Sequence, residues 1–411
     1  MKIKNPPQFI DFIDTTFRDG QQSPLMFDTR KYRFNLDDKK ALAQGLIALG
    51  VRHLEFFSPV VNDDERNDFA QLKDFIRSQT KEKVHLLAHV RCRRNDIVDA
   101  INAGFDGLNM YMGISEKAQK NHGYSMSKIL ELVTETIKTV RAQYPDLYLR
   151  FSVEDCFRTP LTDTFHIYDA LYPYVQTFGM PDTVGVATPQ SVRKYVRALR
   201  KRYPNVALEC HFHNDRGLSL INALTAIEEG VSYMDTSIWG MAERSGITSL
   251  TGILLNLCTE FPNLRTQYAL EHAYSVNVLM GSLLKWQVPY NEPVSLTNRT
   301  HTAGVHQKAV INNRLLYEAH GLSEYGVTKN QLLLGPLSGW NLIHYYLREI
   351  EQYDVLSDQS KEISRLFKQQ AHVINRKNKP EEVLAKIVAA FNLNKLPNQE
   401  QFLVNRVENL M

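Results

Sequence analysis

The sequence predicts a (β/α)8 barrel followed by a small, mostly helical C-terminal region. Along the first 250 or so residues, short apolar or β-branched runs alternate with longer amphipathic stretches about eight times. This alternation is typical of βα units, which build a parallel sheet. A doubly wound sheet is the competing architecture, but the turn after the first expected strand reads DTTFRDGQQ and lacks a glycine-rich phosphate loop.

Composition and charge agree with this class and exclude several others. The chain has 411 residues, of which 43% are hydrophobic and 23% charged, the usage of a globular protein. Its 48 Lys and Arg against 45 Asp and Glu leave a formal charge of +3, so we expect no nucleic-acid partner. The sequence has neither an apolar run of about 18 residues nor a secretory signal, so we expect no membrane partner and a cytoplasmic location. The four cysteines form no CxxC pair, which argues against a structural zinc.

Eight strands are expected at the apolar runs. They are Phe9–Asp14, Arg52–Phe57, Val84–His89, Gly107–Met112, Tyr148–Ser152, Gln176–Met180, Ala207–His211 and Val231–Asp235. The stretch LDDKKALAQGLIALG, between the first two, predicts a helix with Asn35 as its N-cap and Gly50 as its terminator.

The alternation ends near Pro289, where VPYNEPVSLTNRTHTAGVHQKAV is rich in turn formers. Apolar residues then recur at helical spacing around Trp340–Tyr353, Lys361–Asn375 and Pro380–Phe391. The sequence therefore predicts three parts, a catalytic barrel over 1–275, a linker or lid over 276–330 that carries HTAGVH, and a small helical subdomain over 331–411.

Polar or charged side chains follow the expected strands where each strand ends. They include Arg18, Asp19, His89, Arg91, Arg150, Ser152, Glu154, Asp182, Thr183, His211, His213, Asn214, Asp215, Asp235, Glu243 and Arg244. Chemistry in a (β/α)8 barrel takes place at this end of the strands. Charges that converge on one mouth are costly unless they pair with each other, a metal or a ligand. The pattern therefore predicts a site at the barrel mouth.

The sharpest local feature is HFHND. Residues two apart on a strand point to the same side, so His211 and His213 can present two imidazoles to one ion. Asp19, which follows the first strand, is the natural third ligand. Two histidines and a carboxylate suit a divalent ion that acts as a Lewis acid. The alternative is a pair of strand-end histidines bonded to backbone groups.

Three further residues have two possible roles each, one structural and one functional. Arg18 is either a solvated loop charge or, next to Asp19, a fixed cation for an oxygen that gains negative charge. His89 is either a rim histidine or part of the site. His301, in HTAGVH outside the barrel, is either structural or a general base on a loop that folds over the metal site.

Four motifs carry a resemblance to a known superfamily. FIDTTFRDGQQ, HFHNDRG, GMAERSGITSL and THTAGVH, in this order and spacing, resemble the barrel metalloenzymes that comprise 2-isopropylmalate synthase, homocitrate synthase and HMG-CoA lyase. The resemblance extends over about residues 9 to 345. Within it, AHVRCR, FSVEDCFR, ERSGIT and LSGWN resemble homocitrate synthases in particular.

The resemblance implies a metal-dependent acyltransferase that condenses acetyl-CoA with a 2-oxo acid. The divalent metal would be bound by Asp19, His211 and His213, and Mg, Mn, Co and Zn could each occupy such a site. Arg18 would stabilise the alkoxide that forms on the keto oxygen, and Thr183 would bond the α-carboxylate.

The resemblance also implies a substrate pocket and a base. Gln22 would border the pocket, and the distal carboxylate of a diacid would be received by His89, Arg150 and Ser152. His301, oriented by Glu154, would remove a methyl proton from acetyl-CoA. In the superfamily this histidine comes from the other subunit, so a domain-swapped homodimer is implied.

Charge in the pocket favours a diacid, because a branched aliphatic tail would leave polar groups unpaired at about 1–3 kcal/mol each. The first candidate is 2-oxoglutarate, which would give homocitrate. Departures from the family pattern at Pro181, Ala242 and Thr302 border the pocket. They leave open oxaloacetate, phosphonopyruvate, and the 2-isopropylmalate and citramalate synthase reactions.

Two alternative functions outside this reaction class remain, a lyase and a ligand sensor. A lyase of the superfamily should carry a glycine-flanked cysteine after the eighth strand, whereas Cys258 lies in the helical run ILLNLCTEF. A ligand sensor that has lost turnover would not need a complete set of metal ligands, oxyanion cation and base.

Overall fold

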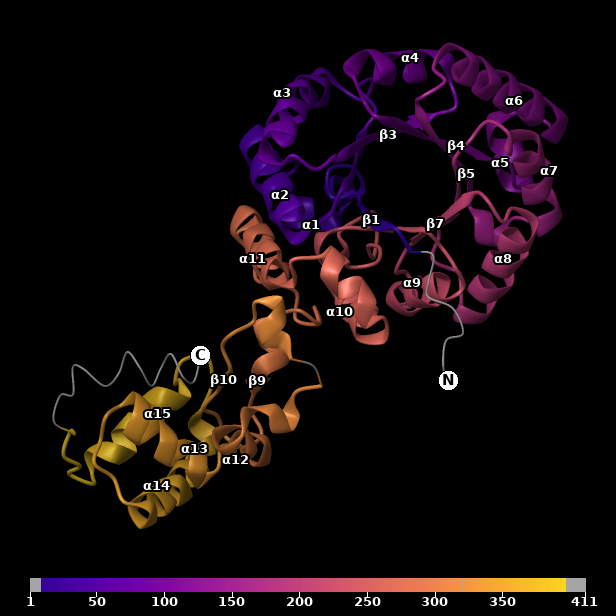
Figure 1. The fold of residues 1–411 in the computed structure, drawn as a ribbon. Helices are drawn as coiled ribbons and strands as arrows, with labels where there is room; N and C mark the ends of the chain where they lie inside the picture. The colour runs from indigo at the N-terminus through magenta and orange to yellow at the C-terminus, as the bar shows by residue number, and fades with distance from the viewer. Residues whose placement is uncertain (1–8, 320, 397–411) are drawn as a thin grey trace. The chain divides into compact units, whose positions relative to one another are not determined.

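The computed structural model describes residues 9–319 and 321–396 and divides into two compact units between Pro293 and Val294. The first, called the barrel unit, is a closed barrel of eight parallel strands in the order β1 to β8 (Figure 1). The second, called the C-terminal unit, is mostly helical. The predicted (β/α)8 fold with a helical C-terminal region is confirmed.

Each strand pairs with the next along the chain, and β1 pairs with β8 to close the barrel. The strands are β1 (Asp11–Asp14), β2 (His53–Phe57), β3 (His85–Arg91), β4 (Gly107–Gly113), β5 (Tyr148–Glu154), β6 (Thr177–Asp182), β7 (Ala207–Phe212) and β8 (Tyr233–Thr236). All eight expected strands are present, and their ends differ from the expected ones by at most two residues.

Helices surround the barrel in chain order, as the change of colour around the ring in Figure 1 shows. They are α1 (Pro24–Asp28), α2 (Leu36–Leu49), α3 (Asp63–Gln79), α4 (Arg94–Ala103), α5 (Glu116–His122), α6 (Met126–Gln143), α7 (Leu161–Leu171), α8 (Pro189–Arg202), α9 (Ser219–Glu228), α10 (Leu250–Glu260) and α11 (Ala273–Leu284). Across residues 9–319 and 321–396, no helix is both long and apolar enough to cross a membrane.

Helix α2 begins and ends at the residues expected from the sequence. The Asn35 side chain accepts a hydrogen bond from the backbone N–H of Asp38 at 2.9 Å, and the Asp38 carboxylate accepts one from the Asn35 N–H at 2.9 Å. This capping box satisfies two donors that a helix start otherwise leaves unpaired. At the other end, Gly50 takes a φ of 110°, a left-handed conformation that favours glycine.

The interior of the barrel becomes more polar toward the carboxyl ends of its strands. Ile13, Leu87 and Tyr233 form a buried apolar cluster inside it. One step further along β5, β7 and β8, the fully buried side chains are Arg150, Glu209 and Asp235. Because side chains on one face of a strand recur every second residue, the next step brings His211 and Ser152 to the mouth. The two-residue repeat thus places a layer of buried charged side chains, Arg150, Glu209 and Asp235, next to the mouth of the barrel.

Strand register places the wall of the site in one row. His89 is paired with Asn109, and Asn109 with Arg150, across β3, β4 and β5. Room for this wall depends on Gly179 of β6, because a Cβ atom there would lie 2.0 Å from Oγ of Ser152. A side chain at position 179 would therefore displace the wall.

The C-terminal unit is built around its own apolar core. Its elements are β9 (Thr300–His301), α12 (Gly304–Asn312), β10 (Gln331–Leu332), α13 (Trp340–Tyr345), a π-helical turn (Tyr346–Ile350), α14 (Ser357–Gln369) and α15 (Pro380–Ala389). Leu342, Ile343, Phe367 and Leu384 lie in this core. The helical patterns expected in this region are therefore present, although the first one changes to a π-helical turn after Tyr345.

The division of the chain into three parts stays a prediction. The unit boundary at Pro293 falls inside the expected linker over 276–330, and residues 397–411 of the expected helical subdomain lie outside the described residues.

Replacement of Asn35 by Ala should lower the free energy of unfolding by about 1 kcal/mol, because the first turn of α2 loses its side-chain cap. Urea denaturation followed by circular dichroism measures this change. Asn35→Ser, which keeps an oxygen acceptor, is the matched control and should retain most of the stability. An equal loss in both variants would show that the cap is not its cause.

Candidate active site

A cavity of about 180 Å³ lies at the carboxyl ends of the barrel strands. Several predicted site residues line it. They are Arg18, His89, Arg150, Ser152, Glu154, Thr183, His211 and His213. Asp19 lies beside His211, Gln22 lines a neighbouring cavity, and His301 belongs to the C-terminal unit.

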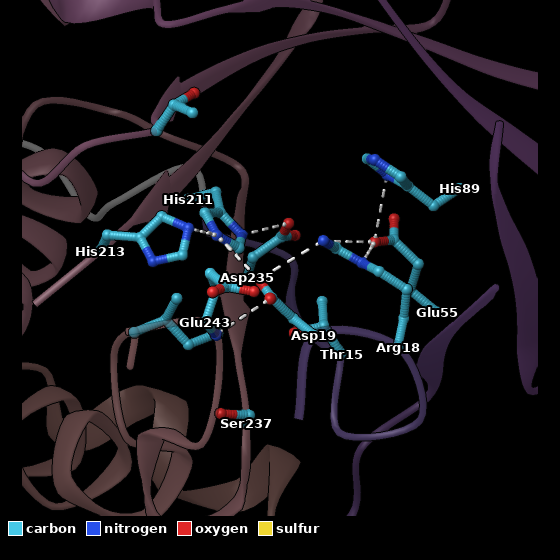
Figure 2. Close-up of polar contacts among 12 residues, drawn as sticks. Thr15, Arg18, Asp19, Glu55, His89, His211, His213, Asp235, Ser237 and Glu243 are labelled. Atoms are coloured by element: carbon cyan, nitrogen blue, oxygen red, sulfur yellow. Dashed lines mark hydrogen bonds and ion pairs between the residues drawn. The ribbon is translucent and has the colours of Figure 1, made fainter. Parts of the chain in front are cut away.

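Three buried side chains form a candidate metal centre. One ligand atom from each of Asp19, His211 and His213 lies within 4.8 Å of the other two. Nε2 of His211 is 3.2 Å from Oδ2 of Asp19 and 3.3 Å from Nε2 of His213 (Figure 2). Buried polar atoms normally have partners, yet Nδ1 of His213 hydrogen-bonds to no described residue. This donor set fits a divalent cation.

The protonation of the two histidines differs. Burial, then the neighbouring His211, lowers the pKa of His213 to about 4, so its imidazole is neutral and able to ligate. Burial alone would also lower the pKa of His211, but hydrogen bonds to Asp19 and Asp235 raise it to about 9. Nδ1 of His211 lies 3.1 Å from Oδ2 of Asp235. A carboxylate in this position would hold the proton on Nδ1 and leave Nε2 available to bind a divalent cation.

Arg18 lies between Asp19 and Glu55, as Figure 2 shows. Its Nε donates to Oε1 of Glu55 at 3.1 Å, and its Nη1 is 3.4 Å from Oδ2 of Asp19. Although burial disfavours its charge, Asp19 and Glu55 raise the pKa of Arg18 above its usual value. The guanidinium is thus a fixed cation beside the candidate metal centre.

Arg150 is held by carboxylates from three other strands. Its Nη2 donates to Oε2 of Glu55 at 2.8 Å, and its Nη1 donates to Oδ1 of Asp235 at 3.0 Å and lies 3.4 Å from Oε2 of Glu209. Its Nε is buried and has no partner among the described residues. The sequence placed Arg150 in the substrate pocket, and the structure adds that its charge is shared among these carboxylates. Its contact with substrate stays a prediction.

The remaining pocket residues divide between two cavities. His89, whose ring stacks on Tyr111 with 4.5 Å between centroids, lines both the first cavity and a neighbouring one of about 480 Å³. Gln22 lines only the neighbouring cavity. Oγ1 of Thr183 accepts a hydrogen bond from the backbone N–H of Asp155 at 2.8 Å.

His301 belongs to the C-terminal unit, whereas Glu154 ends β5 of the barrel unit. Nε2 of His301 is buried without a partner among the described residues. Burial, and then the proximity of His306, lowers the pKa of His301, so its ring is neutral near pH 7. The expected pairing of His301 with Glu154 stays a prediction, because the two residues are in different units.

Sequence reasoning missed Glu55, Asn109 and Tyr111, which connect the predicted residues to one another. Glu55 and Asn109 are polar residues inside otherwise apolar strands, HLEFF and GLNMYMG. A buried polar residue in an apolar strand was the available signal. At the rim of the barrel, Nε of Arg244 pairs with Oδ1 of Asp215 at 2.8 Å.

Comparison with known families agrees with this geometry. Residues 9–279, which contain the whole barrel, match the family model described as HMGL-like. The chain belongs to the HMGL-like family. Residues 294–375 match a second model, described as homocitrate synthase post-HMGL domain-like. The superfamily recognised from the sequence motifs is confirmed, and with it the assignment of the chain to homocitrate synthase-like acyltransferases.

Curated relatives of this HMGL-like chain match it over most of its length. The mitochondrial homocitrate synthase of Saccharomyces cerevisiae is 32% identical over 87% of the chain and 78% of its own length. The homocitrate synthase of Schizosaccharomyces pombe is 32% identical over 90% of the chain and 87% of its own length. A 2-isopropylmalate synthase of Caldanaerobacter subterraneus is 28% identical over 87% and 89% of the two chains.

Solved structures confirm the fold of the HMGL-like barrel. The HMG-CoA lyase of Bacillus subtilis superposes with a TM-score of 0.58 at 23% identity, and the match covers 69% of this chain and 97% of the lyase.

Metal affinity should rise with pH, because the ion competes with the proton on His211. The pKa of about 9 means that His211 is protonated at pH 7. His213, with a pKa of about 4, is already deprotonated there, so it does not contribute to the pH dependence of the metal affinity. Mn²⁺ binding measured by electron paramagnetic resonance should strengthen about tenfold per pH unit from pH 7 to 8.5. An affinity that stays flat over this range would contradict the arrangement.

Replacement of Arg150 by Met should lower the free energy of unfolding by about 3–5 kcal/mol, because Glu55 and Asp235 lose their buried counter-charge. Arg202→Met is the matched control. Arg202 pairs with Asp169 at the surface, so its loss should cost less than about 1 kcal/mol. Similar losses in the two variants, measured by chemical denaturation, would argue against a buried ion network.

Proposed function

We propose that the chain is a metal-dependent acyltransferase that condenses acetyl-CoA with 2-oxoglutarate, giving homocitrate and CoA. The homocitrate synthases and the 2-isopropylmalate synthase among its relatives support acetyl-CoA and a 2-oxo acid as substrates. The observation that carries the proposal is the Asp19, His211 and His213 cluster beside Arg18, in a cavity with hydrogen-bond donors on its opposite wall.

The candidate metal centre and Arg18 would act on the keto group. A divalent metal held by Asp19, His211 and His213 would polarise this group as a Lewis acid. Arg18 is fixed by Glu55 and Asp19, so its N–H groups are in place before charge develops on the keto oxygen. Preorganised donors of this kind stabilise a transition state without reorganisation. Thr183, on the cavity wall, would bond the α-carboxylate of the oxo acid.

One part of the cavity lining, called the distal wall and formed by His89, Arg150 and Ser152, would select a diacid. Together these three residues would receive the second carboxylate of 2-oxoglutarate, and Gln22 would border the pocket from the neighbouring cavity. A branched aliphatic tail would leave these polar groups unpaired, at about 1–3 kcal/mol each.

His301 would be the base. Its neutral Nε2 would take a proton from the methyl carbon of acetyl-CoA, and Glu154 would orient the ring. The resulting carbon nucleophile forms the new C–C bond with the keto carbon as the C=O π bond breaks, and the keto oxygen then takes up a proton from solvent and becomes the hydroxyl of the product. Water then hydrolyses the thioester and releases CoA. We propose that His301 reaches the barrel of a second copy, which makes the enzyme a domain-swapped homodimer.

Acetyl-CoA-dependent thiol release with a panel of 2-oxo acids tests the reaction. The metal-loaded protein should prefer 2-oxoglutarate to oxaloacetate, 2-oxoisovalerate, pyruvate and phosphonopyruvate. His211→Ala and His301→Ala should each lower kcat by about 100-fold or more, since a general base alone contributes that much. His372→Ala, at an exposed histidine of the C-terminal unit, should be unaffected. Preference for 2-oxoisovalerate or pyruvate would assign the protein to 2-isopropylmalate or citramalate synthesis instead.

Complementation between two inactive variants tests the origin of the base. Asp19→Ala and His301→Ala, unfolded together and refolded, should regain about a quarter of wild-type activity. Half of the randomly formed dimers are mixed, and a swap leaves one intact site in each of them. Each variant refolded alone is the control. No recovery in the mixture would mean that His301 serves the barrel of its own chain.

A further inference from the structure

Asn109, in the middle of β4, connects Glu55 to His89 and Ser152 of the distal wall. Its amide Nδ2 lies 2.8 Å from Oε2 of Glu55 and 2.9 Å from Nδ1 of His89. Its carbonyl oxygen accepts a hydrogen bond from Oγ of Ser152 at 3.3 Å. The Asn109 side chain is 2% exposed, so these contacts replace all of its water.

The orientation of this amide follows from its neighbours. An amide nitrogen carries two hydrogens, and the Asn109 amide has two acceptors within reach, the Glu55 carboxylate and the His89 ring. The reversed amide would direct its carbonyl oxygen at Oε2 of Glu55 from 2.8 Å, which places two acceptors against each other. The nitrogen therefore faces Glu55 and His89, and it donates one hydrogen to each.

His89 is held in its neutral form. Burial, and then the charges of Arg18 and Arg150, lowers the pKa of His89 well below its usual value. Nδ1 is 3.6 Å from Oε1 of Glu55, which is too far for a hydrogen bond from a protonated Nδ1. The same nitrogen is 2.9 Å from the Asn109 amide, which is a donor. Nδ1 therefore accepts, and the single ring proton must be on Nε2.

We infer that Asn109 is a positioning residue that fixes neutral His89 as its Nε2–H tautomer, so that His89 presents a hydrogen-bond donor to the oxo acid. Stacking on Tyr111 at an interplanar angle of 17° keeps the ring plane in place. No other described residue hydrogen-bonds Nε2, which leaves this N–H for a ligand of the two cavities that His89 lines.

The tautomer determines which ligand the wall accepts. A carboxylate oxygen only accepts hydrogen bonds, so an N–H donor at His89 favours a second carboxylate and a bare lone pair would repel it. Because the His89 ring is neutral, it adds no third positive charge beside Arg18 and Arg150. This part of the inference rests on the proposed function, whereas the tautomer itself does not.

Nitrogen NMR of the full-length protein tests the tautomer directly. The protein, loaded with diamagnetic Mg²⁺ and labelled with ¹⁵N-histidine, gives a two-bond ¹H–¹⁵N correlation spectrum, in which His89→Gln identifies the His89 signals. We expect an unprotonated Nδ1 and a protonated Nε2 from pH 6 to 8. A protonated Nδ1, alone or together with Nε2, would overturn the inference whatever the substrate proves to be.

Asn109→Asp tests the link to substrate binding. The carboxyl group of this variant can donate at most one hydrogen, and Glu55 would accept it. The oxygen that faces His89 then has no hydrogen left to donate, so Nδ1 of His89 should become protonated and donate to it. The KM for 2-oxoglutarate should rise about tenfold or more, the loss expected for a hydrogen bond to a charged group. The KM for acetyl-CoA and the affinity for Mn²⁺ should not change. An unchanged KM for 2-oxoglutarate together with a switched tautomer would contradict a role in substrate binding.

Asn222→Asp is the matched control. Asn222 is 1% exposed and donates to the carbonyl of Ala187 outside the cavity, so this variant buries the same new carboxyl group. It should lose stability and keep its KM values. If Asn109→Asp does not fold, the wild-type spectrum alone still decides the tautomer. A protonated Nε2 in a protein that rejects diacids would reject the proposed substrate and leave the tautomer assignment intact.

Discussion

The buried contact between Arg150 and two carboxylates organises the whole mouth of the barrel. Glu55 binds Arg150 and also holds Arg18, while Asp235 binds Arg150 and also holds His211. The fixed cation Arg18, the candidate metal ligand His211 and the distal wall are therefore parts of one network. Buried ion pairs contribute little net stability because their desolvation is costly, yet removal of one partner is expensive. The network therefore keeps the site residues in fixed positions.

Much of the barrel and part of the site could be predicted from the sequence. The alternation of apolar runs with amphipathic stretches indicates the eight strands, and the carboxyl-end rule then assigns Asp19, His211 and His213 to one mouth. The cap at Asn35 is equally local, because both of its hydrogen bonds join residues three apart. Features that depend on neighbouring residues in the chain are the ones that sequence patterns reveal.

The contacts within the network could not be predicted, because they join residues far apart in the chain. Arg150 meets Glu55 over 95 positions and Asp235 over 85. The strands of a parallel barrel are covered on both faces, so their apolar residues do not mark which face is inside, and Glu55 and Asn109 were overlooked. Arg150 was predicted to lie in the substrate pocket and lines the cavity, but its carboxylate partners became evident only from the register of the strands.

Binding of oxo acids in the absence of acetyl-CoA isolates what the barrel mouth recognises. Calorimetric titration of the Mg²⁺-loaded protein and of the same protein after EDTA treatment would compare 2-oxoglutarate with 2-oxoisovalerate. The arrangement of Asp19, His211 and His213 beside Arg18 and the polar wall predicts that 2-oxoglutarate binds only when metal is present, and more tightly than 2-oxoisovalerate. Equal binding without metal, or tighter binding of 2-oxoisovalerate, would contradict it.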